Sequence, residues 1–588
     1  MTAKVVVLQV GAGIQRDGTT FASPSYVDGK WVRFQYARPR KIGGYVGVFL
    51  NGTDISRGMI MSADNGLNYI ISGYYSGVER WITDNDDGVG SGPTQFTLTG
   101  FTSNANNLWQ FDIGYDALGN GVNNLIAHPG QNLSDITSTV NTRPLFGPFT
   151  GTTLAPVGVF TATGTLTSGL PTVTFASTYA AMGAGMTVTG TGIPSNTTIV
   201  SALEVGGIWT VTLDNNATAS GAQTLTFDNN IEVSGGIVML FPYLFAYGND
   251  GYIANCAAGD FNNWTSADSN KNNVSSTKVV KGLPLRGGTT SPAGLFWTLD
   301  SVVRVTYAPQ SVGASTLYWR YDLITQQSSI LSSQCVIEYD GIFYWAGTDR
   351  FLMYNGVIQE VENKQNLNYF FDNLNYKQRQ KVWVSKVPRW GEIWWFFPNG
   401  NSDECNDAII YNVRDKVWYD AGKALGARRS AGVFSEVFRK PVWGGWEDNP
   451  NNGHTLWQHE TGTNEVYTNK VDAIDSYFET NVIGSRMGLV GSVEQPGDNV
   501  WTRIERMEPD FVQVGEMTMV VTGNGYADDP PQDSDPYPFD PDTLKIDMKE
   551  QRREMRLRFR SNTQNGDYFM GRVLLSIDTG DVRGTGNP

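Results

Sequence analysis

The sequence predicts a mainly β protein: a β-propeller-like array of short antiparallel sheets, with a small all-β (Ig-like) domain inserted into it. Three observations lead to this prediction. The 588 residues include 66 Gly, 26 Tyr, 28 Phe and 17 Trp, which favour strands and tight turns, while only 17% are charged. Short aromatic runs alternate with Gly, Asn and Asp turns along most of the chain. Long Ala/Leu/Glu/Lys runs, which are typical of helical bundles, are missing.

The repeating unit is a pair of short aromatic strands joined by a turn. Clear examples lie at residues 68–81, 243–254 and 336–356, and the last contains Asp-Gly and Asn-Gly turns between apolar runs. Because such units recur roughly every 40 to 60 residues, we expect propeller blades, about six for this length. An array of two-sheet sandwiches is the structural alternative.

Changes in composition divide the chain into four parts. Residues 1–156 are assigned to N-terminal propeller blades and residues 230–475 to further blades. Between them, residues 157–229 change to a Thr/Gly/Ala/Val-rich pattern almost without charge, which predicts an inserted small β domain. Residues 476–588 are assigned to a C-terminal β region.

Three segments have distinct local patterns. Apolar residues recur with helical spacing near 366–381, so one short amphipathic helix is expected there. Residues 527–542 are acidic and proline-rich, which predicts a loop. Beyond it, Met555, Leu557 and Phe559 alternate with arginines, which predicts a strand with the apolar side chains inward and the arginines outward.

Charge and cysteine content limit the functional class. The 43 Lys and Arg against 58 Asp and Glu give a formal net charge of −15, the wrong balance for binding duplex DNA through its phosphates. Cys256, Cys335 and Cys405 lie far apart and form no CxxC, so we expect buried, reduced thiols. The N-terminus does not match a signal peptide and no apolar run is long enough to span a bilayer, so we expect a cytosol-made protein without membrane insertion.

No motif predicts a catalytic, cofactor-binding or metal site. Residues 5–13 resemble a strand leading into a dinucleotide loop, but the third glycine and the helix are missing. Residues 84–88 resemble a calcium loop without its spacing or closing glutamate, which favours a hairpin turn. His454 and His459 are five apart in an expected strand, which directs them to opposite faces. We therefore predict no cofactor and no enzyme, with one alternative: carboxylates from distant blades can form a glycosidase site that spacing does not reveal.

Two basic clusters remain. Residues 30–41 interleave cations with aromatic side chains, and residues 552–560 contain five arginines. Cation–π packing or a solvated strand face explains most of them. The alternative is contact with acidic neighbours in an oligomer, which suits a chain of net charge −15 better than nucleic-acid binding does.

Several stretches together resemble one family. They are Gly18-Thr-Thr, Lys30-Trp-Val-Arg-Phe, Arg38-Pro-Arg-Lys-Ile-Gly-Gly-Tyr45, Leu108-Trp-Gln-Phe-Asp112, Asn124-Leu-Ile-Ala-His-Pro129, Val233-Ser-Gly-Gly-Ile-Val, Pro242-Tyr-Leu-Phe-Ala-Tyr-Gly-Asn-Asp-Gly251, Pro496-Gly-Asp-Asn-Val-Trp501, Asp540-Pro-Asp-Thr-Leu-Lys-Ile-Asp547, Arg560-Ser-Asn and Gly566-Asp-Tyr-Phe-Met-Gly571. On these residues the chain resembles the tail nozzle proteins, or packaged-DNA stabilisation proteins, of short-tailed bacteriophages (podoviruses). The resemblance covers nearly the whole chain except residues 157–229.

The resemblance implies a structural virion protein. Six copies would form a homohexameric ring that extends the DNA channel of the portal–tail complex, retains packaged DNA and passes it at infection. The implied partners are tail adaptor and portal proteins, tail needle, fibre or spike proteins, and genomic DNA that passes without sequence-specific binding. The implied location is the tail of the virion, after assembly in the host bacterial cytoplasm. We expect the inserted domain outside the ring, where it does not obstruct the channel.

Two other functions stay open. One is a receptor-binding or glycan-depolymerising tail spike or fibre component, although the parallel β-helix repeats typical of spikes are not visible. The other is a propeller lectin, which would bind glycans as a monomer.

Overall fold

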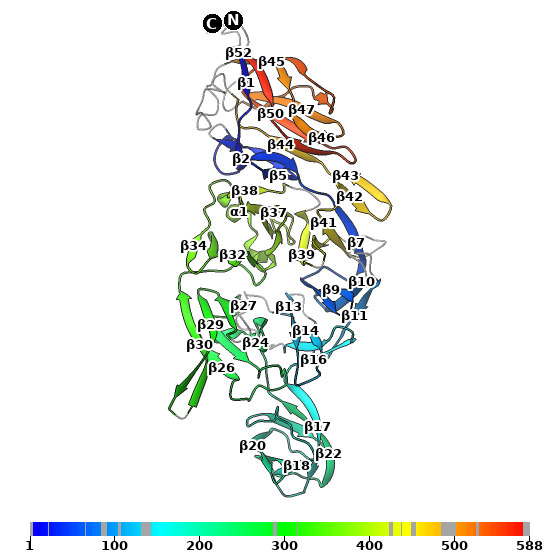
Figure 1. The fold of residues 1–588 in the computed structure, drawn as a ribbon, viewed down its shortest axis with the longest axis vertical. Helices are drawn as coiled ribbons and strands as arrows, with labels where there is room; N and C mark the ends of the chain where they lie inside the picture. Colours follow the sequence, from blue (N-terminus) through cyan, green and yellow to red (C-terminus); the bar gives the residue numbers. More distant parts are fainter. Residues whose placement is uncertain are drawn as a thin grey trace.

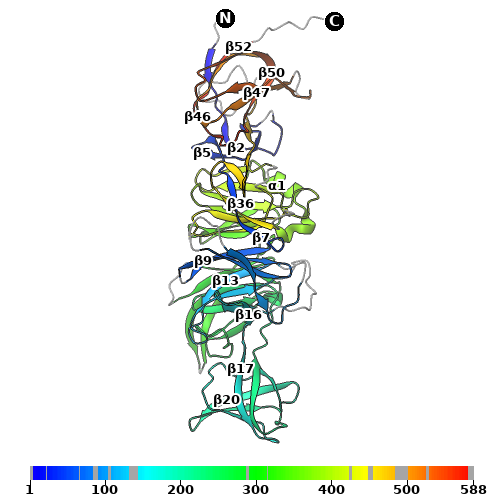
Figure 2. The ribbon, with the colours of Figure 1, turned by 90° about the vertical axis from the view of Figure 1, so that its right-hand side faces the viewer.

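The computed structural model describes residues 4–579, apart from 21–22, 65, 84–90, 104–107, 131–142, 286–290, 314, 423–426, 437, 448–453, 484–500 and 525–528. Most of these residues lie in strands, which confirms the predicted mainly β array of small sheets. Figure 1 shows three parts along the long axis: an end module with both chain termini, a ring of sheets, and a barrel at the opposite tip. Figure 2 shows the same order from the side.

Seven small sheets make up the ring within the described residues. In five of them the strands adjoin in sequence order, in one β12 is added beside β16, and the last takes β7 from near the N-terminus as its fourth strand. Sheet by sheet, the strands are β8 Gly58–Asp64, β9 Leu67–Tyr74, β10 Gly77–Thr83 and β11 Ser91–Gln95; β13 Gln110–Tyr115, β14 Asn123–His128, β15 Leu145–Pro148 and β16 Thr153–Pro156, with β12 Thr97–Leu98 beside β16; β23 Gly236–Leu240, β24 Tyr243–Tyr247, β25 Tyr252–Asn255 and β26 Asn270–Asn273; β27 Val279–Pro284, β28 Ala293–Thr298, β29 Val302–Val312 and β30 Ser315–Thr325; β31 Val336–Tyr339, β32 Ile342–Ala346, β33 Phe351–Tyr354 and β34 Ile358–Glu360; β35 Trp383–Val387, β36 Glu392–Phe397, β37 Asp407–Asn412 and β38 Val417–Asp420; β39 Arg429–Phe434, β40 Pro441–Gly445, β41 His454–His459 and β7 Tyr45–Gly52, with β42 Asn464–Tyr467 and β43 Lys470–Ala473 beyond β7.

The first strand of each sheet lies nearest the centre of the ring. Contacts run from β39 to β8, β13, β23 and β27 in turn, and from β31 through β35 back to β39, as in a propeller. Two strands far apart in the sequence close the ring. Strand β7 pairs antiparallel with β41, from Gly52 opposite His454 to Tyr45 opposite His459. The described part of the ring thus has seven sheets where about six blades were expected, since the last sheet is completed by a distant strand that local patterns do not assign to it.

Strands inside the ring are apolar on both faces because each sheet packs between two others. Strand β36 is buried at every position. Trp394 and Phe396 join one hydrophobic cluster, while Trp395 and Phe397 join another on the opposite face. Burial of one large apolar side chain contributes about 1.5–3 kcal/mol, so such strands hold neighbouring sheets together.

The inserted module is a closed barrel with the strand order β17-β18-β21-β20-β19-β22. The bounds are β17 Val159–Leu166, β18 Thr172–Phe175, β19 Thr187–Gly190, β20 Thr197–Val205, β21 Ile208–Leu213 and β22 Gly221–Asp228. Toward the end of β17 every second side chain is buried, as the alternation of Thr with Ala, Gly and Leu predicts. Because Val159 pairs with Asp228, the two ends of the module leave side by side and attach it to the ring at one edge.

The end module is built from both ends of the chain. Its large sheet contains β1 Lys4–Val7, β52 Leu574–Thr579, β45 Thr502–Glu508, β50 Ile546–Ser561, β44 Ser476–Glu479, β4 Asp28–Lys30, β47 Met517–Asn524, β48 Gln532–Asp533 and β49 Tyr537–Phe539; smaller sheets contain β46 Phe511–Val514, β51 Asp567–Met570, β6 Arg38–Lys41 and β5 Val32–Gln35, and β2 Gly11–Ile14 and β3 Ser25–Tyr26. Residues 4–41 therefore lie here and not in the first blades, where residues 1–156 were placed. The reason is that β1 pairs with β52 and β4 with β44, across nearly the whole chain.

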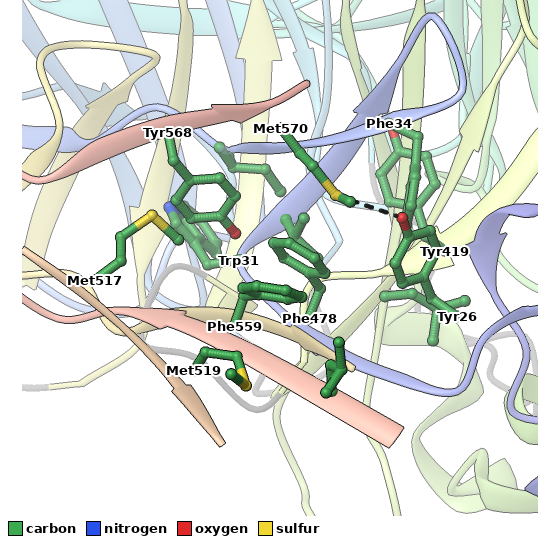
Figure 3. Packing of buried hydrophobic residues seen from close by; sticks show 14 of the residues in the cluster. Tyr26, Trp31, Phe34, Tyr419, Phe478, Met517, Met519, Phe559, Tyr568 and Met570 are labelled. Atoms are coloured by element: carbon green, nitrogen blue, oxygen red, sulfur yellow. Dashed lines mark hydrogen bonds between the residues drawn. The ribbon is translucent and has the colours of Figure 1, made fainter. Parts of the chain in front are cut away.

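The core of the end module is aromatic and rich in methionine (Figure 3). Met555, Leu557 and Phe559 of β50 are fully buried, which confirms the inward face predicted for this strand. Phe559 stacks on Phe478, with ring centroids 5.2 Å apart. Tyr419 enters this core from ring strand β38 and meets Phe34 at 5.4 Å, so the ring and the end module share one hydrophobic core.

Local predictions met different outcomes. The helix expected near 366–381 is α1 Leu367–Asn373, followed after a break by a 3-10 turn, η3 Tyr376–Lys381; a second such turn is η2 Asn249–Gly251. The acidic segment 527–542, expected as a loop, contains from residue 529 onward the short strands β48 and β49, because both find an open edge of β47. The calcium-like stretch 84–88 lies outside the described residues. Among the described helices, none has the length and apolarity to cross a membrane.

Glu79 of β10 gives a pH-dependent contribution to stability. Its carboxylate accepts hydrogen bonds from the backbone N (3.1 Å) and Oγ1 (2.6 Å) of Thr53, yet burial raises the pKa of Glu79 to about 7. The unfolded chain releases this proton near pH 4.3. The contribution of Glu79 to the free energy of unfolding should therefore fall by about 4 kcal/mol as the pH rises from about 4.3 to about 7.

Glu79→Gln tests this. The thermal midpoint of the wild type should fall relative to that of the variant as the pH is raised from 5 to 8. A difference that stays constant over this range contradicts the prediction.

Candidate functional site

A cluster of buried charged side chains lies at the junction between the end module and the ring. Arg33 of β5 is 1% exposed and donates to Glu392 Oε2 (3.1 Å) and to both carboxylate oxygens of Glu460 (2.9 and 2.5 Å). Glu392 also accepts from Tyr419 Oη (2.7 Å) and Trp394 Nε1 (2.9 Å). The cluster thus ties β5 of the end module to two ring sheets.

Burial and pairing act against each other at this cluster. Burial raises the pKa of Glu392, and Arg33 is the main group that opposes the rise. Burial by itself lowers the pKa of Arg33, but Glu392 and Glu460 together raise it above its ordinary value. The ion pairing therefore favours the charged forms of Arg33 and Glu392 against the effect of burial. Removing one of the two leaves the other as a buried, unpaired charge.

A second, half-buried cluster joins the N-terminal segment to the sixth sheet. Arg16 donates to Asp28 Oδ1 (2.5 Å) and to both oxygens of Asp420 (2.9 Å each). Next to it, Asp407 accepts from Tyr369 Oη of α1 at 2.5 Å, and burial together with the charge of Asp420 raises the pKa of Asp407 to about 6. The carboxylates of both clusters are engaged by side chains of neighbouring elements, so they hold parts of the fold together.

The centre of the ring contains a small cavity of about 160 Å³. First strands line it, with Gln110 of β13 and Lys281 of β27 among the polar groups, and Gln334 just before β31. The amides close the centre: Gln110 Nε2 donates to Gly235 O (2.8 Å) and Gln334 Nε2 to Trp109 O (3.2 Å). Burial lowers the pKa of Lys281, against the charge of Asp112. This volume is below the range of about 300–1,000 Å³ of ordinary ligand sites, so the cavity suits water-sized occupants.

A larger groove of about 570 Å³ lies on the end module. Trp501, 39% exposed, lines it together with Asp529, Gln532, Glu550 and Arg552. Glu550 accepts from Tyr537 Oη (2.7 Å) and pairs with Arg552 (3.1 Å). An aromatic side chain beside amides, carboxylates and a guanidinium is a surface that can bind polar ligands. No sequence pattern marked this groove, because its residues come from separate strands and loops.

Exposed apolar side chains lie on outer hairpins and edges of all three modules. In the ring they are Val312, Leu317 and Leu323 of the long β29–β30 hairpin; in the barrel they are Leu203, Val205 and Ile208 of the β20–β21 hairpin; and in the end module they are Val512 and Val514 of β46, whose exposed fractions are 76% and 56%. Strand β46 is an outer strand of its sheet. Open edges with apolar side chains favour contact with another chain.

The two basic clusters found in the sequence fold differently. In the C-terminal cluster, Arg556 and Arg558 pair with Glu479 (3.2 and 2.6 Å), and Arg560 pairs with Asp475 (2.6 Å). These contacts lie within one chain and account for three of the five arginines without an oligomer. In the 30–41 cluster, Lys41 Nζ donates to Gly566 O (2.7 Å), and burial lowers the pKa of Lys41 to about 8.

The histidines and cysteines have structural surroundings. His459 packs on Trp443, with ring centroids 4.0 Å apart, and burial together with Arg429 lowers its pKa well below the ordinary value. The three cysteines are buried and free, as expected from their spacing. Across the described ranges, no group of three or more His, Cys, Asp or Glu residues is placed to hold a metal ion.

No protein-family model and no curated protein matches the chain. Solved structures do match. A computationally designed protein, Ika8, has 10% identity and a TM-score of 0.30, covering 71% of this chain and 99% of its own. An exo-β-1,3-galactanase from Phanerochaete chrysosporium has 9% identity and a TM-score of 0.25, covering 91% and 100%. An ulvan lyase of polysaccharide lyase family 25 has 10% identity and a TM-score of 0.28, covering 71% and 96%.

At these identities and TM-scores the matches transfer no activity to this chain. The expectation that the chain is no enzyme is nevertheless withdrawn, because the matched structures include a galactanase and a lyase. The reasoning behind that expectation was the lack of a motif. It fails because acidic residues from distant sheets meet only in the folded protein, where sequence spacing does not show them.

The Arg33 cluster allows a direct test of the junction. Arg33→Leu should lower the free energy of unfolding by about 3–5 kcal/mol, because Glu392 and Glu460 then lose their counter-charge in a buried site. Thermal and urea unfolding measure the loss.

Arg38→Leu, a change at an exposed arginine of β6, is the matched control and should stay within about 0.5 kcal/mol of wild type. Adding Glu392→Leu to Arg33→Leu should restore part of the loss. Equal stability of Arg33→Leu and the control would show that the cluster does not hold the junction.

Proposed function

We propose that this chain is a structural subunit of a ring-shaped tail nozzle of a short-tailed bacteriophage. The observation that carries the proposal is the distribution of exposed apolar side chains over hairpins and edges in all three modules. A monomer in water gains nothing from such edges, whereas neighbouring subunits along the whole length of the molecule would cover them. The sequence resemblance supplies the identity of the ring.

The shape and the charge support this proposal. The three modules stack along one axis, which suits a subunit that extends a channel (Figures 1 and 2). The net charge of −15 limits adhesion of passing DNA to the channel wall. In this proposal the ring docks on adaptor and portal proteins, carries needle, fibre or spike proteins, and retains and passes genomic DNA in the virion tail.

Particle mass and low-resolution cryo-EM test the nozzle. The purified chain, alone and mixed with portal–adaptor complexes, should form a six-fold ring with an axial channel, and in the mixture the ring should sit on the portal. A stable monomer, or a trimer that ignores the portal complex, would refute the proposal.

A receptor-binding or glycan-depolymerising tail protein is the second candidate. The groove at Trp501 favours it, because an exposed aromatic side chain and carboxylates share one surface. In this reading Asp529 and Glu550 face a bound saccharide, and Glu550 acts as one of two carboxylates of a glycan-cleaving site.

Release of reducing sugars from host surface polysaccharide tests the second candidate. Wild type should release sugars, and Glu550→Gln should reduce the rate at least 100-fold, as expected for a general acid–base group. Glu505→Gln, a change at a partly exposed carboxylate of β45 outside the groove lining, is the control and should keep the rate. No release by wild type removes this candidate.

A further inference from the structure

Three arginines lie at or beside Trp390, in the turn between β35 and β36, and among the described residues none of them has an acidic partner. Arg40 lies 4.7 Å and Arg389 lies 4.9 Å from the centre of the indole ring. Arg414, in the β37–β38 turn of the same sheet, donates to the backbone oxygens of Arg389 (2.9 Å) and Pro388 (2.7 Å). We call Arg40, Arg389 and Arg414 the arginine patch.

The charge of the arginine patch is not balanced by ion pairs. Arg40 donates to the amide oxygen of Gln35 at 2.9 Å, and Arg414 donates to backbone carbonyls, so both arginines donate to neutral groups. Within the described chain, none of the three arginines forms a salt bridge. Arg33, which also lies over Trp390, is different, since it pairs with the two carboxylates Glu392 and Glu460. On a chain of net charge −15, such a local excess of positive charge indicates an acidic partner.

The surface beside the patch has the size of a side-chain pocket. A cavity of about 190 Å³ is lined by Trp390, Arg414 and Tyr36, with Asp415 as the carboxylate at its rim. Tyr36 is 77% exposed. The volume is below that of ordinary small-molecule sites, and an arginine–aromatic surface suits carboxylate side chains of a polypeptide.

We propose that the arginine patch binds the acidic segment 529–542 of a second copy of this chain. This segment supplies exposed aspartates at 535 and 542, and its short strands β48 and β49 pair with β47, which holds it on the surface of the end module. Within one chain, Asp533 and Asp540 have local partners, Thr522 Oγ1 and Thr543 Oγ1 (2.7 Å each). Asp535 and Asp542 form no salt bridge among the described residues, so they can meet the patch of a neighbour.

The two surfaces differ, so their contact is head-to-tail. The patch lies at the turns β5–β6, β35–β36 and β37–β38, whereas the acidic segment joins β47 to β50. A contact between two different surfaces repeats around a ring when the rotation closes. The inference therefore rests on the proposed ring function and names the contact between its subunits.

DNA is the competing occupant, because phosphate also binds arginine beside an aromatic ring. The net negative charge of the chain opposes close approach of duplex DNA. A second copy of the chain, in contrast, carries the acidic segment itself. The observations thus favour a second copy over nucleic acid.

Charge reversal on either surface tests the contact. Arg389→Glu with Arg414→Glu, and separately Asp535→Arg with Asp542→Arg, should each weaken ring formation at least tenfold, measured as particle mass with and without portal–adaptor complexes. The four changes together should restore the ring, since the reversed charges again match. Arg350→Glu is the control: it reverses a 48% exposed arginine that pairs with Asp349, and it should leave the ring intact.

The outcomes separate the contact from the ring itself. If wild type forms no ring, the proposed function fails, and this contact with it. If wild type and both reversed variants form rings equally, the contact is wrong and the ring stands. If the four-fold variant does not restore the ring although its thermal midpoint matches wild type, the acidic segment is not the occupant. If the patch variant keeps the ring and loses DNA binding, the patch is a phosphate site and the inference is overturned.

Discussion

The fold depends on antiparallel pairing between the first fifty residues and strands from the last third of the chain. Strand β7 pairs with β41 and closes the ring, while β4 pairs with β44 and β1 with β52 to build the end module. Each pairing closes a loop of several hundred residues. Loop-closure entropy grows slowly with length, so one such closure costs little more than a shorter one, but the ring and the end module are complete only once both ends of the chain are in place.

Buried charge fixes how the two modules meet. Arg33 with Glu392 and Glu460, and Arg16 with Asp28 and Asp420, reach across the junction. Hydrophobic contacts such as Tyr419 with Phe34 supply the attraction. The ion pairs fix the orientation, because a shifted junction would leave charges unpaired, and Arg33 and Glu392 would then be unpaired in a buried site. A rigid junction of this kind keeps the end module and the ring in one orientation, which a repeating assembly requires.

The surfaces left open are of two kinds, apolar edges and the arginine patch. Exposed apolar side chains lie on hairpins of the barrel and the ring and on an edge strand of the end module, and the patch lies at the junction. A β protein with open edges avoids aggregation by burying them against a defined partner. The acidic surface of the chain limits unspecific contact, so that attraction is confined to matched sites.

The sequence by itself determined which faces of its strands are buried. The alternation around Met555, Leu557 and Phe559 predicted their full burial, and the aromatic strand–turn units predicted an array of small sheets. Composition also predicted the buried, free thiols. These properties are local, because the two-residue period of a strand is written in neighbouring residues.

Only the tertiary structure decided which strands pair. The seventh sheet, the end module around residues 4–41, the closed barrel and the edge strands β48 and β49 all depend on partners distant in sequence or on an open edge. The same holds for charge: Arg33 became a buried ion-pair partner, Arg558 a partner of Glu479, and Arg389 an unbalanced cation. Periodicity states which face of a strand is apolar, but not which distant residue will lie against it, so candidate sites assembled from several strands appear only after folding.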